Sequence, residues 1–181
     1  MNNEYKSLRV EKSGGVAEIV LIGPGKGNAM GPDFWREMPT LFAELDRDDE
    51  TRAIIIRGEG GNFSYGLDLM AMVGGLEIGG ASGKNLAAER TRFLDKVGEM
   101  QQTCDKVADC RKPVIAAING WCIGGGLDLI SACDIRLAAA DAKFSLREAK
   151  IAIVADLGSL QRLPAIIGQG HARELAFTGK D

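Results

Sequence analysis

Short runs of β-branched and other apolar residues, separated by segments with helical spacing, constrain the fold of this chain most. Residues 16–22 (VAEIVLI), 53–57 (AIIIR) and 114–118 (VIAAI) are typical of buried strands, and shorter strands are expected at 135–138 and 143–145. Helices are expected from Asp33, over 86–107, from the glycines at 124–126 and after Asp156. Strands that alternate with helices predict an α/β fold. The 181 residues are enough for one domain, over 1–181.

Charge and composition exclude several functional classes. The net charge of −3 gives no electrostatic reason to expect nucleic-acid binding or attraction to an anionic membrane. The start of the chain lacks the profile of a secretory signal, and the apolar runs are too short to span a bilayer. We therefore expect a soluble, cytoplasmic protein. The four cysteines and single histidine show no metal-ligand spacing, so we expect no metal site and reduced thiols, with Cys122 and Cys133 in the core.

Two glycine-rich motifs have different meanings. Gly23, Gly25 and Gly27 follow a strand, but their spacing is not that of a dinucleotide fingerprint and prolines interrupt it, so we interpret them as a turn. The run at 124–126 leads directly into a helix, whose first N–H groups have no partner within the helix. It can hold an oxyanion, or it can simply allow a helix to pack closely on a strand. A second donor from the loop at 63–68 (FSYGLD) would favour the oxyanion site.

Three acidic residues within one stretch indicate proton-transfer chemistry. Asp128, Glu148 and Asp156 are each flanked by apolar residues, and burial of a carboxyl group raises its proton affinity toward neutrality. Each also has a structural interpretation that stays open at this point. Asp128 can favour a helix dipole, Glu148 can pair with Arg147 or Lys150 at the surface, and Asp156 can be a helix N-cap.

The segments FSYGLDL and NGWCIGGGLDLISACDIRLAAADAKFSLREAKI together resemble the crotonase (enoyl-CoA hydratase/isomerase) superfamily. The resemblance implies a crotonase-like (ClpP/crotonase) fold, a spiral of strand–strand–helix units. It implies that the backbone N–H groups of Leu67 and Gly125 form an oxyanion hole for a thioester carbonyl. Tyr65 replaces the small residue usual in this loop. The substrate-binding residues that the resemblance implies are Ser64, Tyr65, Gly66, Leu67, Asp68, Gly125 and, for a phosphate, Lys26, which can equally be a solvated lysine.

Within that superfamily, the acids most resemble those of dienoyl-CoA isomerases. Simple hydratases carry glutamates at the positions of Asp128 and Glu148, and usually glycine at that of Asp156. The resemblance implies an isomerase that converts a 3,5-dienoyl-CoA to the 2,4-dienoyl-CoA in fatty acid β-oxidation. We expect Glu148 to take the proton at C2 and Asp156 to return one at C6, with Asp128 as an auxiliary that tunes or orients Glu148.

Several further expectations come from the same resemblance. No metal or redox cofactor is expected, because coenzyme A is part of the substrate. A homotrimer or hexamer is expected, while the C-terminal helices of the superfamily are expected to be absent after Asp181. Two other functions stay open: an enoyl-CoA hydratase, which is a lyase, and a non-catalytic acyl-CoA-binding relative. Residues 73–83 are interpreted as a lid or a disordered insertion, and Trp35 and Trp121 as packing residues.

Overall fold

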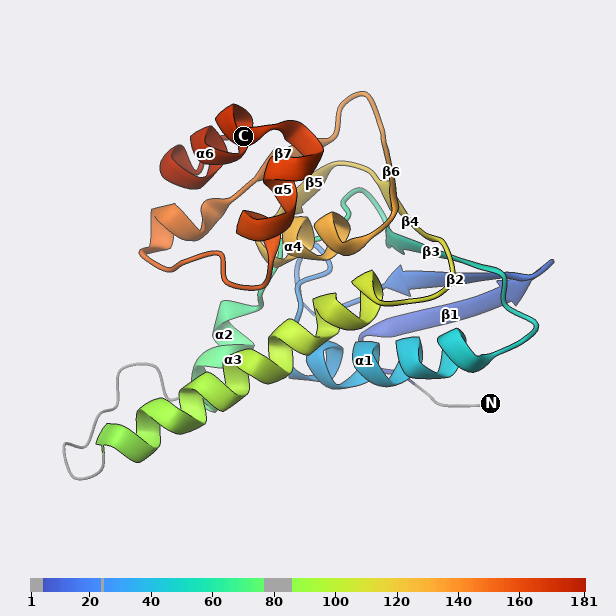
Figure 1. Cartoon of the computed structure of the whole chain (residues 1–181), viewed down its shortest axis with the longest axis horizontal. Coiled ribbons are helices and arrows are strands. Elements are labelled where there is room, and N and C mark those ends of the chain that lie inside the picture. The colour runs from blue at the N-terminus through green and yellow to red at the C-terminus, as the bar shows by residue number, and fades with distance from the viewer. Residues whose placement is uncertain (1–4, 24, 77–85) are drawn as a thin grey trace.

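A computed structural model of the chain describes residues 5–23, 25–76 and 86–181 (Figure 1). The strands are β1 (Leu8–Ser13), β2 (Val16–Leu21), β3 (Ala53–Gly58), β4 (Val114–Ile118), β5 (Trp121–Ile123), β6 (Ile135–Ala138) and β7 (Lys143–Ser145). The α-helices are α1 (Pro32–Arg47), α2 (Leu69–Leu76), α3 (Leu86–Ala108), α4 (Gly125–Ala132), α5 (Ser159–Ile167) and α6 (Gln169–Thr178). A short 3₁₀-helix, η1, spans Arg147–Ile151.

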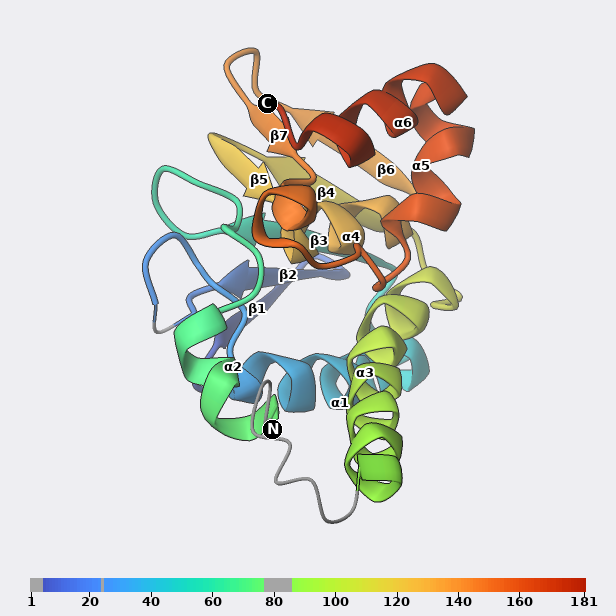
Figure 2. The same cartoon turned by 90° about the vertical axis from the view of Figure 1, so that its left-hand side faces the viewer.

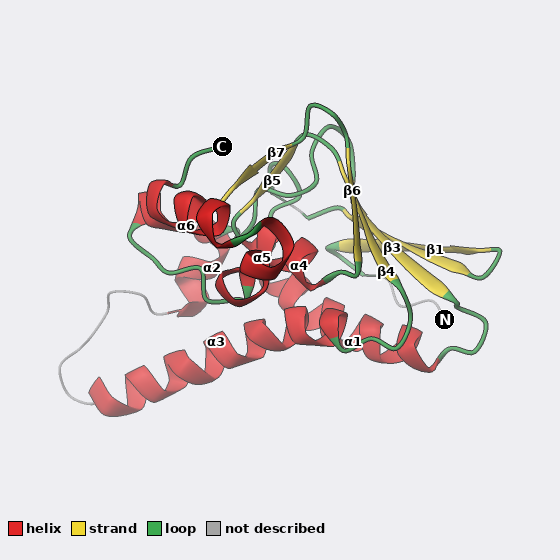
Figure 3. Cartoon of the chain, turned by 45° about the horizontal axis from the view of Figure 1, so that its top comes forward, coloured by secondary structure: helices red, strands yellow, loops and turns green. Residues whose placement is uncertain are grey.

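The described strands form two sheets, and the chain passes from one to the other and back. The larger sheet has the order β1-β2-β3-β4-β6, with β1 antiparallel to β2 and the other pairs parallel. The smaller sheet pairs β5 with β7 in parallel (Figure 3). A bridge between Ser64 and Cys122 extends this sheet. The chain thus places a strand in the large sheet, then one in the small sheet, and then a helix. The predicted α/β class and strand–strand–helix pattern are confirmed.

The core lies between one face of the large sheet and the helices α1, α3 and α4 (Figure 2). Alternate residues of β3 and β4 point into it, among them Ile54, Ile56 and Ala116, all fully buried. Met38 and Phe42 of α1 meet this face with almost no exposed surface. Burial of one such large apolar side chain stabilises the fold by about 1.5–3 kcal/mol, so this layer gives the site a rigid support.

The sequence predicted most elements and missed the shortest. β4, β6 and β7 have the predicted bounds, and α1 begins one residue early because Pro32 fits the first helical turn. β1 and β5 were not predicted, since β1 is polar along much of its length and β5 has three residues. Residues 73–76 belong to helix α2, so the interpretation of 73–83 as a flexible segment is wrong for its first part. Residues 77–83 lie outside the described residues.

Parallel pairing brings the ends of several strands to one edge of the large sheet. β2, β3 and β4 run in the same direction, so the loops after them meet beyond their carboxyl ends. In α/β proteins this edge is where ligands bind. The loop at 59–68, the turn after β4 and the start of α4 all lie there.

Candidate active site

The loop at 63–68 is held against the start of α4 by a buried hydroxyl and a glycine. Ser64 Oγ donates to the carbonyl oxygen of Asn28 at 2.9 Å and accepts the N–H of Gly66 at 3.0 Å. Gly66 has φ +78°, and a Cβ there would lie 2.5 Å from the carbonyl oxygen of Ile123. Only glycine allows this backbone contact. Ser64 and Gly66, predicted to bind substrate, therefore shape the loop, and Ser64 is fully buried.

The N–H of Leu67 points away from Met30, the residue with which Leu67 forms a bridge. Leu67 forms a parallel bridge with Met30, in which Met30 N donates to Gly66 O at 2.7 Å and Asp68 N donates to Met30 O at 3.0 Å. In this pattern the N–H of the central residue faces the other side of the chain. Within the described part of the chain, no acceptor pairs with the N–H of Leu67.

The N–H of Gly125 lies beside that of Leu67. Gly124 has φ +51° and donates its N–H to Ser145 O at 2.9 Å, while its carbonyl oxygen accepts from the first turn of α4. Gly125 begins α4, so its own N–H has no helical partner, and no other described residue accepts it. A Cβ on Gly125 would lie 3.6 Å from Leu67 N. Two free donors thus lie close together, and a pair of backbone donors aimed at one oxygen is the arrangement that stabilises an oxyanion.

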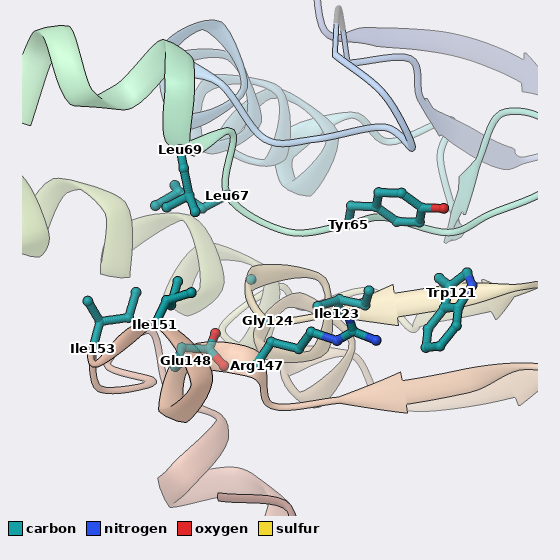
Figure 4. A pocket seen from close by; sticks show the side chains of 11 residues that line it. Tyr65, Leu67, Leu69, Trp121, Ile123, Gly124, Arg147, Glu148, Ile151 and Ile153 are labelled. Carbon is teal, nitrogen blue, oxygen red and sulfur yellow. The ribbon is translucent and has the colours of Figure 1, made fainter. Parts of the chain in front are cut away.

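These donors open into a pocket of about 480 Å³ (Figure 4). The residues that line it are Tyr65, Leu67, Leu69, Trp121, Ile123, Gly124, Gly125, Arg147, Glu148, Ile151 and Ile153. Leu69, Ile151 and Ile153 form one end, whereas Trp121 and Arg147 lie at the other. Trp121 is half-buried in the pocket wall, so its interpretation as a packing residue was incomplete.

Glu148 is the carboxyl group that lines this pocket. A Cβ added at Gly124 would lie only 2.8 Å from Glu148 Oε1, so this oxygen packs against the Gly124 backbone. Glu148 Oε2 is buried and has no partner among the described residues. Burial, and then the charges of Asp128 and Asp156, raise the pKa of Glu148 to about 7. The surface ion pair with Arg147 or Lys150 is wrong, because Glu148 forms no ion pair among the described residues, and Arg147 pairs instead with Asp181 at 2.8 Å. Glu148 is thus poised to accept or release a proton near neutral pH.

Asp128 does not line the pocket. It is 1% exposed on α4, and its Oδ1 accepts the N–H of Ser159 at 2.7 Å. Burial raises the pKa of Asp128, and the hydrogen bond from Ser159 opposes the rise. Asp128 therefore caps the first residue of α5 while its charge raises the proton affinity of Glu148. Both effects fit the predicted auxiliary role, which stays a prediction.

Asp156 does not line the pocket that contains Glu148. It borders a second pocket of about 290 Å³ with Gln101, Asp105 and Arg162 among the residues there. The amide of Gln101 donates to the backbone carbonyl of Asp156 at 2.8 Å and ties this segment to α3. The N-cap of α5 is Gly158, with no side-chain cap, so the N-cap interpretation of Asp156 is wrong. Asp156 is exposed at the surface; partial desolvation raises its pKa, and its charge raises the pKa of Glu148.

Two more predicted substrate-binding residues lie elsewhere. Asp68 Oδ1 accepts the N–H of Ala71 at 3.0 Å, so this carboxylate caps α2 and does not line the pocket. Lys26 is exposed in the turn after β2 and also lies outside the lining. Sequence reasoning missed Arg147 and Trp121, and the sequence offered one signal for Arg147, its place directly before Glu148. Among the described residues, no group of His, Cys, Asp and Glu is arranged to hold a metal ion.

A pair of neighbouring, unpartnered backbone donors in the same pocket as a carboxyl group with a pKa of about 7 suits an acid–base site for a substrate that develops an oxyanion. Comparison with known families agrees: residues 11–181 match the Enoyl-CoA hydratase/isomerase family. The chain belongs to this family and has the crotonase fold.

Individual relatives are more specific. The chain is 46% identical over 180 residues to the mitochondrial Delta(3,5)-Delta(2,4)-dienoyl-CoA isomerase of Dictyostelium discoideum. This match covers 98% of this chain and 61% of that protein. It is 41% identical over 179 residues to the peroxisomal Delta(3,5)-Delta(2,4)-dienoyl-CoA isomerase of Arabidopsis thaliana, with 97% and 64% covered. The solved enoyl-CoA hydratase of Bacillus anthracis superposes with a TM-score of 0.82 at 32% identity, over 97% of this chain and 64% of that one.

The chain spans between 61% and 64% of the length of these two isomerases. What the whole relatives do is therefore a basis for a proposal and not an observation on this chain. No helix in the described ranges has the length and apolarity that a membrane crossing requires.

Proposed function

We propose that this protein is an isomerase that converts a 3,5-dienoyl-CoA to the 2,4-dienoyl-CoA, in fatty acid β-oxidation. One observation carries the proposal: the N–H groups of Leu67 and Gly125 open into the pocket that Glu148 lines, and the pKa of Glu148 is about 7. The names of the relatives at 46% and 41% identity support the same reaction.

The proposed reaction begins at C2 of the thioester. Glu148 removes a proton from C2, and the electron pair moves into the carbonyl, whose oxygen becomes an enolate held by the two backbone donors. Donors of this kind lower a barrier by about 2.7–4 kcal/mol each. The diene extends the enolate to C6, which takes a proton from Asp156. The double bonds then stand at C2 and C4, and no atom is gained or lost.

We assign Asp156 to the far end of such a substrate from its place in the sequence, since in the structure it is exposed and lines a second pocket. The apolar end of the pocket, with Ile151 and Ile153, leads along the chain to Asp156, three residues further on. An acyl chain that passes Glu148 and follows these side chains runs toward the segment that carries Asp156. Separate sites for the two carboxyl groups allow proton transfer between distant carbons.

The hydratase alternative has less support from the site. Addition of water by two acids needs both to face one water molecule, whereas Asp128 is directed to the N–H of Ser159 and does not line the pocket. We keep the hydratase, and the non-catalytic acyl-CoA-binding relative, as outcomes of the test below.

No metal or redox cofactor is proposed, because a proton shift between carbons involves no net oxidation. A homotrimer or hexamer is proposed from the superfamily resemblance, and size-exclusion chromatography with light scattering tests it. A cytoplasmic location gains no support from relatives whose names place them in mitochondria and peroxisomes.

The test is direct. A 3,5-dienoyl-CoA is incubated with the protein, and the ultraviolet absorbance of the conjugated 2,4-diene is followed. We expect conversion by the wild type, and a loss of about 100-fold or more in Glu148→Gln and Asp156→Asn, as for removal of a catalytic acid or base. Water addition to crotonyl-CoA without diene conversion would favour the hydratase, and binding of acyl-CoA without either reaction would favour the non-catalytic relative.

A further inference from the structure

Glu148 is carried by a helix that does not anchor itself. η1 has five residues, Arg147–Ile151, and none of them is buried. A 3₁₀-helix of this length is not stable by itself, and without apolar burial it gains little from the core. The Oε2 atom of Glu148 is nevertheless buried without a partner in the described part of the chain, although a carboxyl group gains free energy when it turns toward water. Contacts from outside η1 must therefore hold Glu148 in the pocket.

These contacts come from residues 179–181, which follow α6 and which we call the C-terminal turn. The end of the chain lies beside β7, as Figure 2 shows. Gly179 has φ +57°, and a Cβ there would lie 3.2 Å from Leu146 O and 3.0 Å from Lys150 Cγ. The C-terminal turn thus packs closely against both ends of η1, and glycine permits this approach.

One buried hydroxyl holds the C-terminal turn. Ser145, the last residue of β7, is fully buried, and its Oγ lies 3.0 Å from Gly179 O and 2.8 Å from Lys180 O. A hydroxyl has one proton, so Ser145 Oγ donates to one of these carbonyl oxygens or shares the proton between them. Among the hydrogen bonds of the described residues, no other donor reaches these two oxygens. Loss of the hydroxyl therefore releases the turn.

The main chain of Ser145 reaches the carboxyl group of Glu148 by a second route. The carbonyl oxygen of Ser145 accepts the N–H of Gly124 at 2.9 Å. Gly124 in turn packs against Glu148, since a Cβ added there would lie 2.8 Å from Oε1. The Glu148 carboxyl group is thus confined by Gly124 and by its own helix. Ser145 fixes both, Gly124 directly and η1 through the C-terminal turn.

We infer that Ser145 is a positioning residue, whose hydroxyl holds the C-terminal turn against η1 and so keeps Glu148 in the pocket. The inference rests on the proposed function in so far as it gives Glu148 a catalytic task. A released turn lets η1 shift, and a shift of about 1 Å in a catalytic group can lower a rate by about 100-fold. The effect falls on the rate and not on binding, because Ser145 does not line the pocket.

Ser145→Ala removes the hydroxyl and little else. The diene conversion is measured over the pH range in which Glu148 titrates, and urea unfolding is measured alongside. We expect kcat to fall about tenfold or more, with KM within about threefold of wild type. The acid limb of the kcat/KM profile should also move to lower pH, because Glu148, whose pKa burial raises to about 7, becomes more hydrated.

A second measurement needs no catalysis. ¹³C NMR of protein labelled at the glutamate carboxyl carbon follows the titration of Glu148, whose signal is the one absent from Glu148→Gln. We expect Glu148 to titrate at lower pH in Ser145→Ala than in the wild type. The charged groups near Glu148 are kept in this variant, namely Asp128 of α4, Asp156, Arg147 and Lys150 of η1, and Asp181, which pairs with Arg147. A shift therefore reports the hydration of Glu148.

Thr51→Val is the matched control. It removes a buried hydroxyl that donates to Asp48 Oδ2 at 2.6 Å, before β3 and so at the opposite edge of the large sheet from the site. We expect this control to lose stability while kcat and the Glu148 titration stay unchanged. Ser145→Thr keeps the hydroxyl and should keep kcat within about threefold of wild type. Gly179→Ala disturbs the same contact from the other side and should act like Ser145→Ala.

Loss of stability in Ser145→Ala with kcat and the Glu148 titration unchanged would show that the hydroxyl serves the fold alone, and would overturn the inference. A raised KM with kcat unchanged would also overturn it, since Ser145 would then act in binding. If Ser145→Ala does not fold, Gly179→Ala decides by the same two readouts. A wild type that converts no diene would refute the proposed function, while the titration would still decide whether Ser145 holds Glu148.

Discussion

Replacement of Glu148 by glutamine should stabilise the protein at alkaline pH and not at acid pH. Glutamine has the same shape and carries no charge. The pKa of Glu148 is about 7 in the folded protein, against the ordinary value of 4.5. Because the folded pKa is the higher one, the wild type loses stability relative to the variant as pH rises from 4.5 to 7, and the loss is complete above 7.

The magnitude follows from the same two values. At 1.36 kcal/mol per pH unit, the interval between 4.5 and about 7 gives an upper bound of about 3.4 kcal/mol. Part of the Glu148 side chain reaches pocket water, and screening there reduces the expected gain to about 1–2 kcal/mol. For a chain of this length such a gain raises Tm by about 2–8 °C.

Urea unfolding of both proteins between pH 4.5 and 8.5, followed by tryptophan fluorescence, measures this difference. The control is Glu99→Gln on α3, an exposed site where a substitution should change stability by less than about 0.5 kcal/mol at every pH. Equal stability of Glu148→Gln and wild type at pH 8, or a gain that does not vary with pH, would refute the claim that Glu148 is held in a desolvated position.

Three further outcomes are expected. Gly124→Ala places a Cβ 2.8 Å from Glu148 Oε1 at φ +51°, so the diene conversion should fall by about 100-fold, and an unchanged rate would contradict the tight fit. Asp128→Asn keeps an acceptor for Ser159 but removes the charge that raises the pKa of Glu148, so the acid limb of the kcat/KM profile should move to lower pH; a fixed limb would argue against the coupling. Phe42→Ala should cost about 3–5 kcal/mol in the free energy of unfolding, and a loss below about 1 kcal/mol would show that Phe42 is not part of a tight core.

Sequence reasoning predicted the fold well because the strands of the large sheet are strongly apolar. Residues 114–118 alternate between the helix-covered face and the other face, and their composition alone predicts a strand. β5 was missed since three residues carry no measurable pattern, and its place depends on pairing with β7, twenty-two residues later. Local sequence cannot supply such long-range pairing.

The site was predicted unevenly for a related reason. Leu67 and Gly125 were found from motifs, and the structure brings their N–H groups together. Arg147 and Trp121 were missed, because their meeting depends on how β5 and β7 pair and on the turn that follows β7. The direction of the Asp128 side chain, toward Ser159 and not into the pocket, is likewise set by the packing of α4 on α5.

The central claim is that the backbone N–H groups of Leu67 and Gly125 hold a thioester oxygen. Titration of ¹⁵N-labelled protein with a saturated acyl-CoA, which can bind but cannot isomerise, tests it by amide NMR. We predict that the amide protons of these two residues move downfield, more than other amides and in a saturable way. Saturable shifts elsewhere in the spectrum with these two signals unmoved would contradict the account.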